Sequence, residues 1–303
     1  MGPTGDVSTI LSRAVRLSVP LAFAATGEYV AERAGTLNIS VEAMMLGGAF
    51  FGVWGTSATG SVGGGLLIGV LAGLVVAWVQ ANLSHRLTAN QFVVGLTLNV
   101  LLLGLTSFLF ETWKLTPHQA GILTIPLLNH IPIVGKPLFV ERWPAFLLVL
   151  VVPFVWWLVQ RSRFGLEVRA VGERPEAADV SGIEVNKRRR QAIYLCGAMA
   201  GFGGAYLSVA EVGLFNEGMT AGRGFIAIAA VIFGGWTLRG TILGCFLFGG
   251  ADALRLALPS LGVTLTPELL IAAPYLLALI AMLFFAQRNR QPAALAQPFV
   301  RGV

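Results

Sequence analysis

Residues 145–160 read Ala-Phe-Leu-Leu-Val-Leu-Val-Val-Pro-Phe-Val-Trp-Trp-Leu-Val-Gln, without one charged side chain. The stretch from Leu269 to Ala286 has the same character. A helix needs about 20 mostly apolar residues to cross the hydrocarbon core of a membrane. These two stretches therefore predict that the chain spans a membrane.

The composition agrees with that prediction. The chain has 303 residues, of which 55% are hydrophobic and 12% are charged, and its mean hydropathy is +0.76. Soluble domains carry roughly 25% charged residues, so a soluble enzyme is excluded. We expect one transmembrane domain over residues 1–303, with a cytoplasmic loop at about 161–190 and a cytoplasmic tail at about 287–303.

Apolar segments recur along the whole chain and are separated by Gly, Pro, Asn and charged residues. They predict an all-α fold, a polytopic transmembrane helix bundle of about 8–10 spans. The segments run from Ser8 to Val30, Ile39 to Trp54, Val62 to Leu83, Gln91 to Phe110, Trp143 to Gln160, Gln191 to Val209, Phe225 to Trp236, Thr241 to Leu258 and Leu269 to Ala286.

The basic residues indicate the topology, because Lys and Arg collect in cytoplasmic loops. The net charge of +6 is therefore interpreted as a topology signal, not as a nucleic-acid site. The basic residues of the loop are Arg161, Arg163, Arg169, Arg174, Lys187, Arg188, Arg189 and Arg190.

Alternation from this cytoplasmic loop orients the other loops. It places Ser84 to Asn90 inside, Glu111 to Arg142 outside, and Arg288 and Arg290 of the tail inside. The N-terminus is then outside if Ile39 to Trp54 is a full crossing. Arg13 and Arg16 favour the opposite side.

Two shortened segments, Ile39 to Trp54 and Phe225 to Trp236, occupy corresponding places in the two halves of the chain. Each contains paired glycines, and the two halves have opposite predicted orientation. This pattern indicates pseudo-inverted repeats, which place substrate sites at broken helices near the middle of the membrane.

Glycines spaced four apart predict close helix packing in lipid. They are Gly65, Gly69 and Gly73, Gly197 and Gly201, and Gly240 and Gly244.

No catalytic or metal-binding constellation is visible. The two cysteines, Cys196 and Cys245, lie in apolar runs and are interpreted as buried thiols, so no disulfide is implied. The histidines His85, His118 and His130 are expected in loops, without metal-ligand or triad spacing. No GxxxxGK[ST] phosphate loop occurs, so any ATP hydrolysis requires a partner subunit. We expect no cofactor.

Ionisable residues at membrane depth are functional candidates because burying a charge there is costly. Glu28, Glu42, Asp252 and Arg255 qualify. Asp252 and Arg255 are three residues apart on one helix face and are expected to pair with each other. Glu42 is a candidate both for the pathway and for bracing the start of the short helix.

Further polar residues near the predicted breaks are candidates for a substrate pathway. Amide side chains donate and accept hydrogen bonds, which suits neutral polar substrates. The same residue types also make interhelical hydrogen bonds, which is the structural alternative. The pathway candidates are Asn38, Ser40, Glu42, Asn90, Gln91, Asn99, Asn216 and Arg223, with Phe215, Met219 and Phe225 as stacking surfaces.

The cytoplasmic loop contains a short helix signal. Pro175 suits the first turn, Glu176 complements the helix N-terminus, and Gly182 ends the helix. A partner protein could grip such a surface helix; the alternative is an ordinary solvated loop.

Three strings resemble the permeases of ABC importers for branched-chain amino acids and simple sugars, most closely the nucleoside permease branch. They are Glu32 to Phe50 (ERAGTLNISVEAMMLGGAF), Phe164 to Ile183 and Met219 to Gly234, and the likeness extends from about Leu11 to Ala286. Two positions depart from the branch, since Ala43 stands where Gly is usual and the turn Trp236 to Gly240 is atypical. Nucleosides and ribose-like sugars both remain open as substrates.

The resemblance implies a type II ABC importer-like permease in the bacterial cytoplasmic (inner) membrane. Its implied partners are a second, homologous permease in a heterodimer, a cytoplasmic ATP-binding cassette ATPase, an extracellular or periplasmic substrate-binding protein, and membrane lipids. It also implies an ATPase coupling segment made of Glu173, Pro175, Glu176, Ala177, Ala178, Gly182 and Ile183.

Two rival functions remain at this point. A self-sufficient secondary transporter would use Glu28 or Glu42 as its proton site. An intramembrane enzyme is disfavoured because paired acid, base or metal residues are absent.

Overall fold

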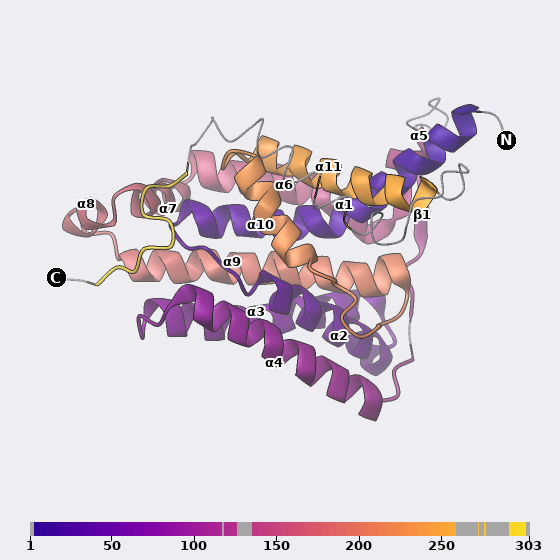
Figure 1. Ribbon diagram of the computed structural model, residues 1–303, viewed down its shortest axis with the longest axis horizontal. Helices are drawn as coiled ribbons and strands as arrows, with labels where there is room; N and C mark the ends of the chain where they lie inside the picture. Colours follow the sequence, from indigo (N-terminus) through magenta and orange to yellow (C-terminus); the bar gives the residue numbers. More distant parts are fainter. Residues whose placement is uncertain are drawn as a thin grey trace.

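The computed structural model describes residues 3–116, 118–125, 135–258 and 291–300, together with positions 272 and 276. Helices run lengthwise through it (Figure 1). The predicted span Leu269 to Ala286, the basic residues Arg288 and Arg290, and His130 lie outside the described residues.

The predicted apolar segments that fall within the described residues all form helices, and the predicted helix bundle is confirmed. Five helical stretches are long and apolar enough to cross a membrane: α3, α4, η1 with α6, α9 with η2, and α11. The helices are α1 (Pro3–Arg33), α2 (Val41–Thr59), α3 (Val62–His85), α4 (Gln91–Thr112), α5 (Gly135–Phe139), η1 (Trp143–Phe146), α6 (Leu147–Arg161), α7 (Arg163–Glu173), α8 (Pro175–Val180), α9 (Val185–Ala205), η2 (Tyr206–Val212), α10 (Arg223–Phe233) and α11 (Leu238–Ala257).

A small antiparallel hairpin was not foreseen. Strand β1 (Ile122–Thr124) pairs with β2 (Val140–Arg142), with Leu123 opposite Glu141. The hairpin and α5 lie at the end of the bundle opposite to α7 and α8 (Figure 1). If the basic loop that holds α7 and α8 is cytoplasmic, as the sequence predicts, the hairpin end is the outer one.

The start of α1 lies at the hairpin end, while residues 291–300 lie at the α8 end (Figure 1). This placement agrees with the alternation argument in which Ile39 to Trp54 is a crossing. The side of the membrane favoured by Arg13 and Arg16 stays the alternative prediction. Glu141 of β2 accepts a hydrogen bond from the Arg16 Nε at 3.1 Å, so Arg16 anchors the outer hairpin.

Two helices begin in the interior of the bundle instead of at its ends. Both α2 and α10 start part-way along α9 and run toward opposite ends (Figure 1). Residues 34–40 lead from α1 into α2, and residues 213–222 lead from η2 into α10. This arrangement matches the predicted inverted pair of broken segments, although α2, with 19 residues, is longer than expected.

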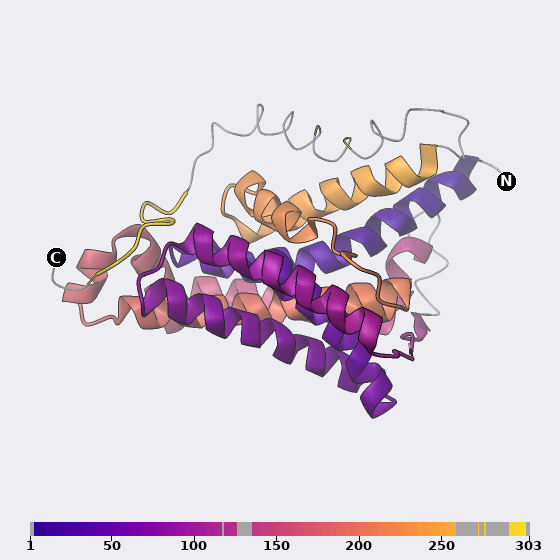
Figure 2. The ribbon, with the colours of Figure 1, turned by 60° about the horizontal axis from the view of Figure 1, so that its bottom comes forward.

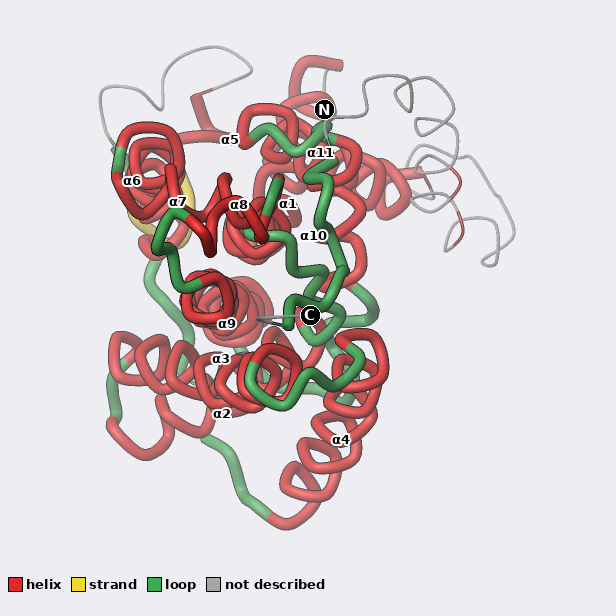
Figure 3. Tube along the Cα trace, turned by 90° about the vertical axis from the view of Figure 1, so that its left-hand side faces the viewer, coloured by secondary structure: helices red, strands yellow, loops and turns green. Residues whose placement is uncertain are grey.

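Glycines allow the central helices to approach closely. A Cβ on Gly201 of α9 would lie 2.6 Å from the carbonyl oxygen of Gly69, and one on Gly197 would lie 2.6 Å from that of Gly73. Viewed from the α8 end, α9 lies between α1 on one side and α2 and α3 on the other (Figure 3). The predicted role of the four-spaced glycines in helix packing is confirmed.

Candidate functional site

The N-terminus of α10 is capped by a carboxylate from another helix. Glu42, in the first turn of α2, accepts hydrogen bonds from Thr220 Oγ1 at 2.6 Å and from the backbone N–H groups of Gly222 at 2.9 Å and Gly224 at 2.6 Å. A Cβ on Gly224 would collide with the Glu42 backbone. A helix N-terminus carries unpaired N–H groups and partial positive charge, which a carboxylate satisfies.

The N-terminus of α2 is capped in a similar way by α4. The Asn99 Oδ1 atom accepts from the Ala43 N–H at 2.9 Å, and its Nδ2 donates to the Ile39 carbonyl oxygen at 3.0 Å. Asn99 therefore supports α2, and α2 in turn supports α10 through Glu42. The two interior helix starts form one connected hydrogen-bonded junction.

The 34–40 linker is sealed in the core. The Glu28 carboxylate accepts from the Asn38 N–H at 3.0 Å and from the Cys196 thiol at 3.2 Å. Ser40 Oγ donates to Asn38 Oδ1 at 2.7 Å, and both side chains are fully buried. In this conformation, Asn38 and Ser40 stabilise the linker and are not accessible to a substrate.

Three other predicted pathway residues also make structural contacts. Asn90 is exposed and caps α4, accepting from Phe92 and Val93. Gln91 is buried and accepts from the Leu37 N–H at 3.2 Å. Phe215 is buried with its ring centroid 5.1 Å from that of Phe50.

The remaining candidates are accessible. Asn216 is exposed, Met219 and Arg223 are half-buried, and the Phe225 side chain is 42% exposed. They follow the broken segment 213–222 into the first turn of α10, next to the Glu42 junction. The structure thus separates an accessible group from a buried one, although the sequence did not distinguish them.

An ion-paired cluster links α10 to α11. The Arg255 Nη2 lies 2.7 Å from Asp252 Oδ1, which confirms the predicted pairing of Asp252 with Arg255. Arg223 Nη2 also lies 3.7 Å from Asp252 Oδ2. Sequence spacing could not reveal this second contact, because Arg223 is on a different helix.

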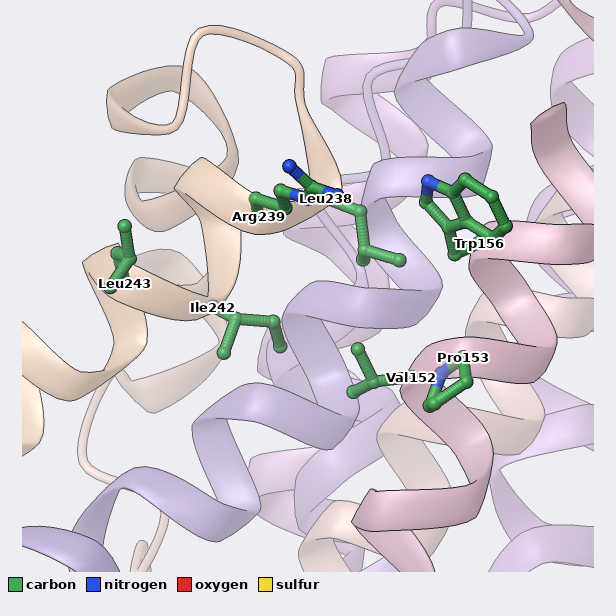
Figure 4. Close-up of a pocket in the computed structure, with 7 residues that line it drawn as sticks. All are labelled: Val152, Pro153, Trp156, Leu238, Arg239, Ile242 and Leu243. Carbon is green, nitrogen blue, oxygen red and sulfur yellow. The ribbon is translucent and has the colours of Figure 1, made fainter.

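A groove of about 510 Å³ lies between α6 and α11, but its chemistry does not suit the predicted amide-based site. Figure 4 shows its lining, in which Arg239 is the one charged side chain among apolar ones. The lining residues are Val152, Pro153, Trp156, Leu238, Arg239, Ile242 and Leu243.

In the loop predicted to be cytoplasmic, α8 forms as the sequence predicted. Pro175 is its first residue, Glu176 is in its first turn, and Gly182 follows with a φ of +85°, a conformation that favours glycine. Pro175 and Ala178 are buried, so they hold α8 against the protein.

The outer face of α8 is exposed. Glu173, Glu176, Ala177 and Gly182 are exposed, and Ile183 is half-buried. Sequence reasoning missed Val180, whose side chain is 90% exposed at the end of α8. Val180 lies four residues after Glu176 and three after Ala177, so all three are on one face of the helix. That spacing could have identified Val180 from the sequence. An apolar side chain left in water there suits contact with another protein.

His85 corrects one expectation. It is the last residue of α3 and is buried, with its Nε2 atom 2.9 Å from Thr36 Oγ1, so it is not a loop residue. His118 is exposed in a loop, as expected. Within the described residues, no group of three or more His, Cys, Asp or Glu side chains is arranged to hold a metal.

Glu141 lies in the hairpin, outside the predicted spans. Burial raises the pKa of Glu141 to about 7, while the Arg16 guanidinium opposes that rise. The hydrogen bond between Glu141 and Arg16 of α1 belongs to this hairpin and not to the junction at Glu42.

Comparisons with known proteins all point to transport permeases. Residues 10–286 match the family described as branched-chain amino acid transport system / permease component. A putative glucose ABC transporter permease of Haloferax volcanii is 40% identical, with 86% of this chain and 80% of the relative aligned. The nucleoside ABC transporter permease NupC of Lactococcus lactis is 32% identical over 97% of each chain.

The guanosine ABC transporter permease NupQ of Bacillus subtilis is 31% identical over 98% of each chain. No solved structure matches significantly. The family match covers far more than half of the chain, and the helices are long and apolar enough to cross a membrane. The chain therefore belongs to the family of branched-chain amino acid transport system permease components and is a multi-pass membrane protein.

Proposed function

We propose that this chain is the permease subunit of an ABC importer for nucleosides, and for purine nucleosides in particular. Two relatives that align along nearly their full length support this substrate class, one a nucleoside permease and the other a guanosine permease. The chain lacks a phosphate-loop motif, so we assign ATP hydrolysis to a separate cytoplasmic subunit.

The main structural support is the position of Glu42. The N-termini of broken membrane helices often bind the carboxylate of an anionic substrate. Here the Glu42 carboxylate already occupies the N-terminus of α10, accepting from Gly222 and Gly224. A free amino acid would have to compete with this internal carboxylate. The arrangement therefore favours a neutral substrate.

The accessible residues beside this junction suit a nucleoside. The exposed ring of Phe225 and the side chain of Met219 offer apolar surface to a planar base. The exposed Asn216 amide can donate and accept hydrogen bonds with a base or a ribose. We propose Asn216, Met219, Arg223 and Phe225 as the pathway residues.

A second permease would complete this pathway. Two guanosine permeases of Bacillus subtilis, NupQ and NupP, match this chain at 31% and 27% identity. That pair supports a heterodimer of related permeases. We further propose that an external binding protein delivers the substrate to the outer end, and that the ATPase binds the outer face of α8.

A sugar is the second candidate substrate, because the putative glucose permease of Haloferax volcanii is 40% identical. The two candidates can be separated by uptake into vesicles that contain the complete complex. We expect unlabelled adenosine or guanosine to compete with labelled guanosine, and glucose, ribose and leucine to have little effect. Competition by a sugar alone would establish the alternative, and uptake without the ATPase would contradict the importer.

Val180 tests the docking surface. Because Val180 is 90% exposed, Val180→Asp should leave the melting temperature of the permease unchanged while reducing ATPase affinity about tenfold or more. Glu184→Gln, an exposed neighbour, is the control and should bind the ATPase normally. Normal ATPase binding by Val180→Asp would show that α8 is not the docking element.

A further inference from the structure

Residues 291–300 lie across the cytoplasmic end of the bundle, at a place that the proposed function does not use. Figures 1 and 2 both show this segment, in yellow, beside α7 and α8. It contacts the 34–40 linker, the end of α7 and the start of α9. These contacts join the proposed ATPase-facing surface to the linker.

Backbone hydrogen bonds attach the segment on two sides. The Ala294 N–H donates to the Gly172 carbonyl oxygen of α7 at 2.9 Å, and the Ala296 N–H donates to the Gly35 carbonyl oxygen at 3.0 Å. Ala294 is almost completely buried. Gly35 has a φ of +83°, and a Cβ there would lie 3.1 Å from the Ala294 carbonyl oxygen. Glycine therefore permits the linker and the segment to approach.

Arg189 of α9 joins the same two pieces of chain through its side chain. Its Nε donates to the Ala34 carbonyl oxygen at 3.2 Å, and its Nη1 donates to the Gln297 carbonyl oxygen at 2.6 Å. Arg189 is fully buried, and no carboxylate of the described residues lies within ion-pair distance of it. A buried cation is costly unless it is hydrogen-bonded. Within the described residues, Nε and Nη1 of Arg189 have partners and Nη2 has none, so Arg189 depends on these two carbonyl oxygens.

Phe299, near the C-terminal end of the segment, packs against a small apolar cluster. The cluster consists of Val171 of α7, Ala178 of α8 and Val185 of α9. The Asn186 Nδ2 atom also donates to the Phe299 carbonyl oxygen at 3.3 Å. Because Ala178 is on the inner face of α8, a displacement of α8 would move Phe299 as well.

We propose that residues 291–300 form a strap that transmits movement of α8 to the 34–40 linker, with Arg189 as its positioning residue. At one end, Phe299 of the strap packs against the apolar cluster that α8 shares with α7 and α9. At the other end, the strap meets the linker through Gly35 and through Arg189. The linker leads directly into α2, which carries Glu42 and caps α10. This inference rests on the proposed docking of an ATPase on α8.

The experiment measures the number of ATP molecules hydrolysed per substrate molecule transported by the complete reconstituted complex. Arg189→Gln should raise this ratio at least about tenfold, while ATPase binding and hydrolysis persist. Arg189→Lys should partly restore the ratio, because the ammonium group can still donate to a carbonyl oxygen. A deletion of residues 291–303 should uncouple the complex at least as strongly.

Arg190→Gln is the matched control. Within the described residues, the Arg190 side chain hydrogen-bonds only its own helix, where its Nε donates to the Asn186 carbonyl oxygen at 3.4 Å. It should therefore keep the normal ratio. If Arg189→Gln and the deletion variant both transport with the normal ratio, the strap is refuted.

A purely structural role is also distinguishable. It would lower the amount of assembled complex and leave the ratio per assembled complex unchanged, which would overturn the proposal. If the unmodified complex shows no ATP-dependent uptake, the proposed function itself fails, whatever the strap variants do.

Discussion

The two broken segments differ sharply in their exposure to solvent. In the 34–40 linker, Asn38 and Ser40 are fully buried and hydrogen-bonded to each other. In the 213–222 segment, Asn216 is exposed and leads to the half-buried Met219. The two segments occupy corresponding places in an inverted pair, so the difference is not a consequence of position in the sequence pattern.

The difference suggests separate roles for the two breaks. A backbone that leaves a helix inside the membrane must have its N–H and C=O groups satisfied by protein or water. Side chains of α1, α4 and α9 surround the first break, and Glu28 and Gln91 satisfy its backbone. The second break is covered less completely. We therefore expect the first to support structure and the second to face the substrate.

The largest expected effect is a loss of folding stability on replacing Glu42, the residue that joins the two breaks. Glu42→Ala removes the acceptor for Thr220, Gly222 and Gly224. Because each unsatisfied N–H group costs about 1–3 kcal/mol, the two N–H groups predict a loss of about 2–6 kcal/mol of folding free energy. The melting temperature and the yield of folded protein in detergent measure it, with the exposed Glu217→Ala as control. Wild-type stability would mean that the two breaks are held independently.

A smaller loss of stability is expected from adding a methyl group where α9 packs against α2, beside the first break. A Cβ on Gly204 of α9 would overlap the Met45 backbone of α2, whereas a Cβ on Gly104 of α4 would meet nothing within 4 Å. Gly204→Ala should therefore destabilise the protein by about 2–3 kcal/mol through overpacking. Gly104→Ala should be neutral or slightly stabilising because alanine favours helix. Equal melting temperatures for the two variants would argue against the tight packing of α2 on α9.

The smallest expected effects come from replacing one asparagine in each break. Asn216→Ala should weaken substrate uptake about tenfold, equivalent to roughly 1.4 kcal/mol, with an unchanged melting temperature, because its side chain is exposed. Asn38→Ala should lower the melting temperature, since its buried partners lose hydrogen bonds. The two measurements are KM for uptake and thermal unfolding. The reverse pattern would exchange the roles of the two breaks.

Much of the fold was predictable because its signals are local. Apolar runs predicted every described spanning helix, and Pro175 and Gly182 predicted the limits of α8. The candidate site was less predictable. Among the polar candidates, Asn99 and Glu42 cap helices that lie 56 and 180 residues away in sequence, respectively, and no local pattern specifies such partners.

By itself, the sequence determined that this chain is a helical membrane protein with a short surface helix in a basic loop and two corresponding breaks. Those properties depend on hydrophobicity, charge and turn residues that act over a few neighbours. Only the tertiary structure decided which break is sealed, that Glu42 fills the start of α10, and that Arg189 binds residues 291–300. These outcomes depend on burial and on hydrogen bonds between distant segments, which exist only after the helices have packed.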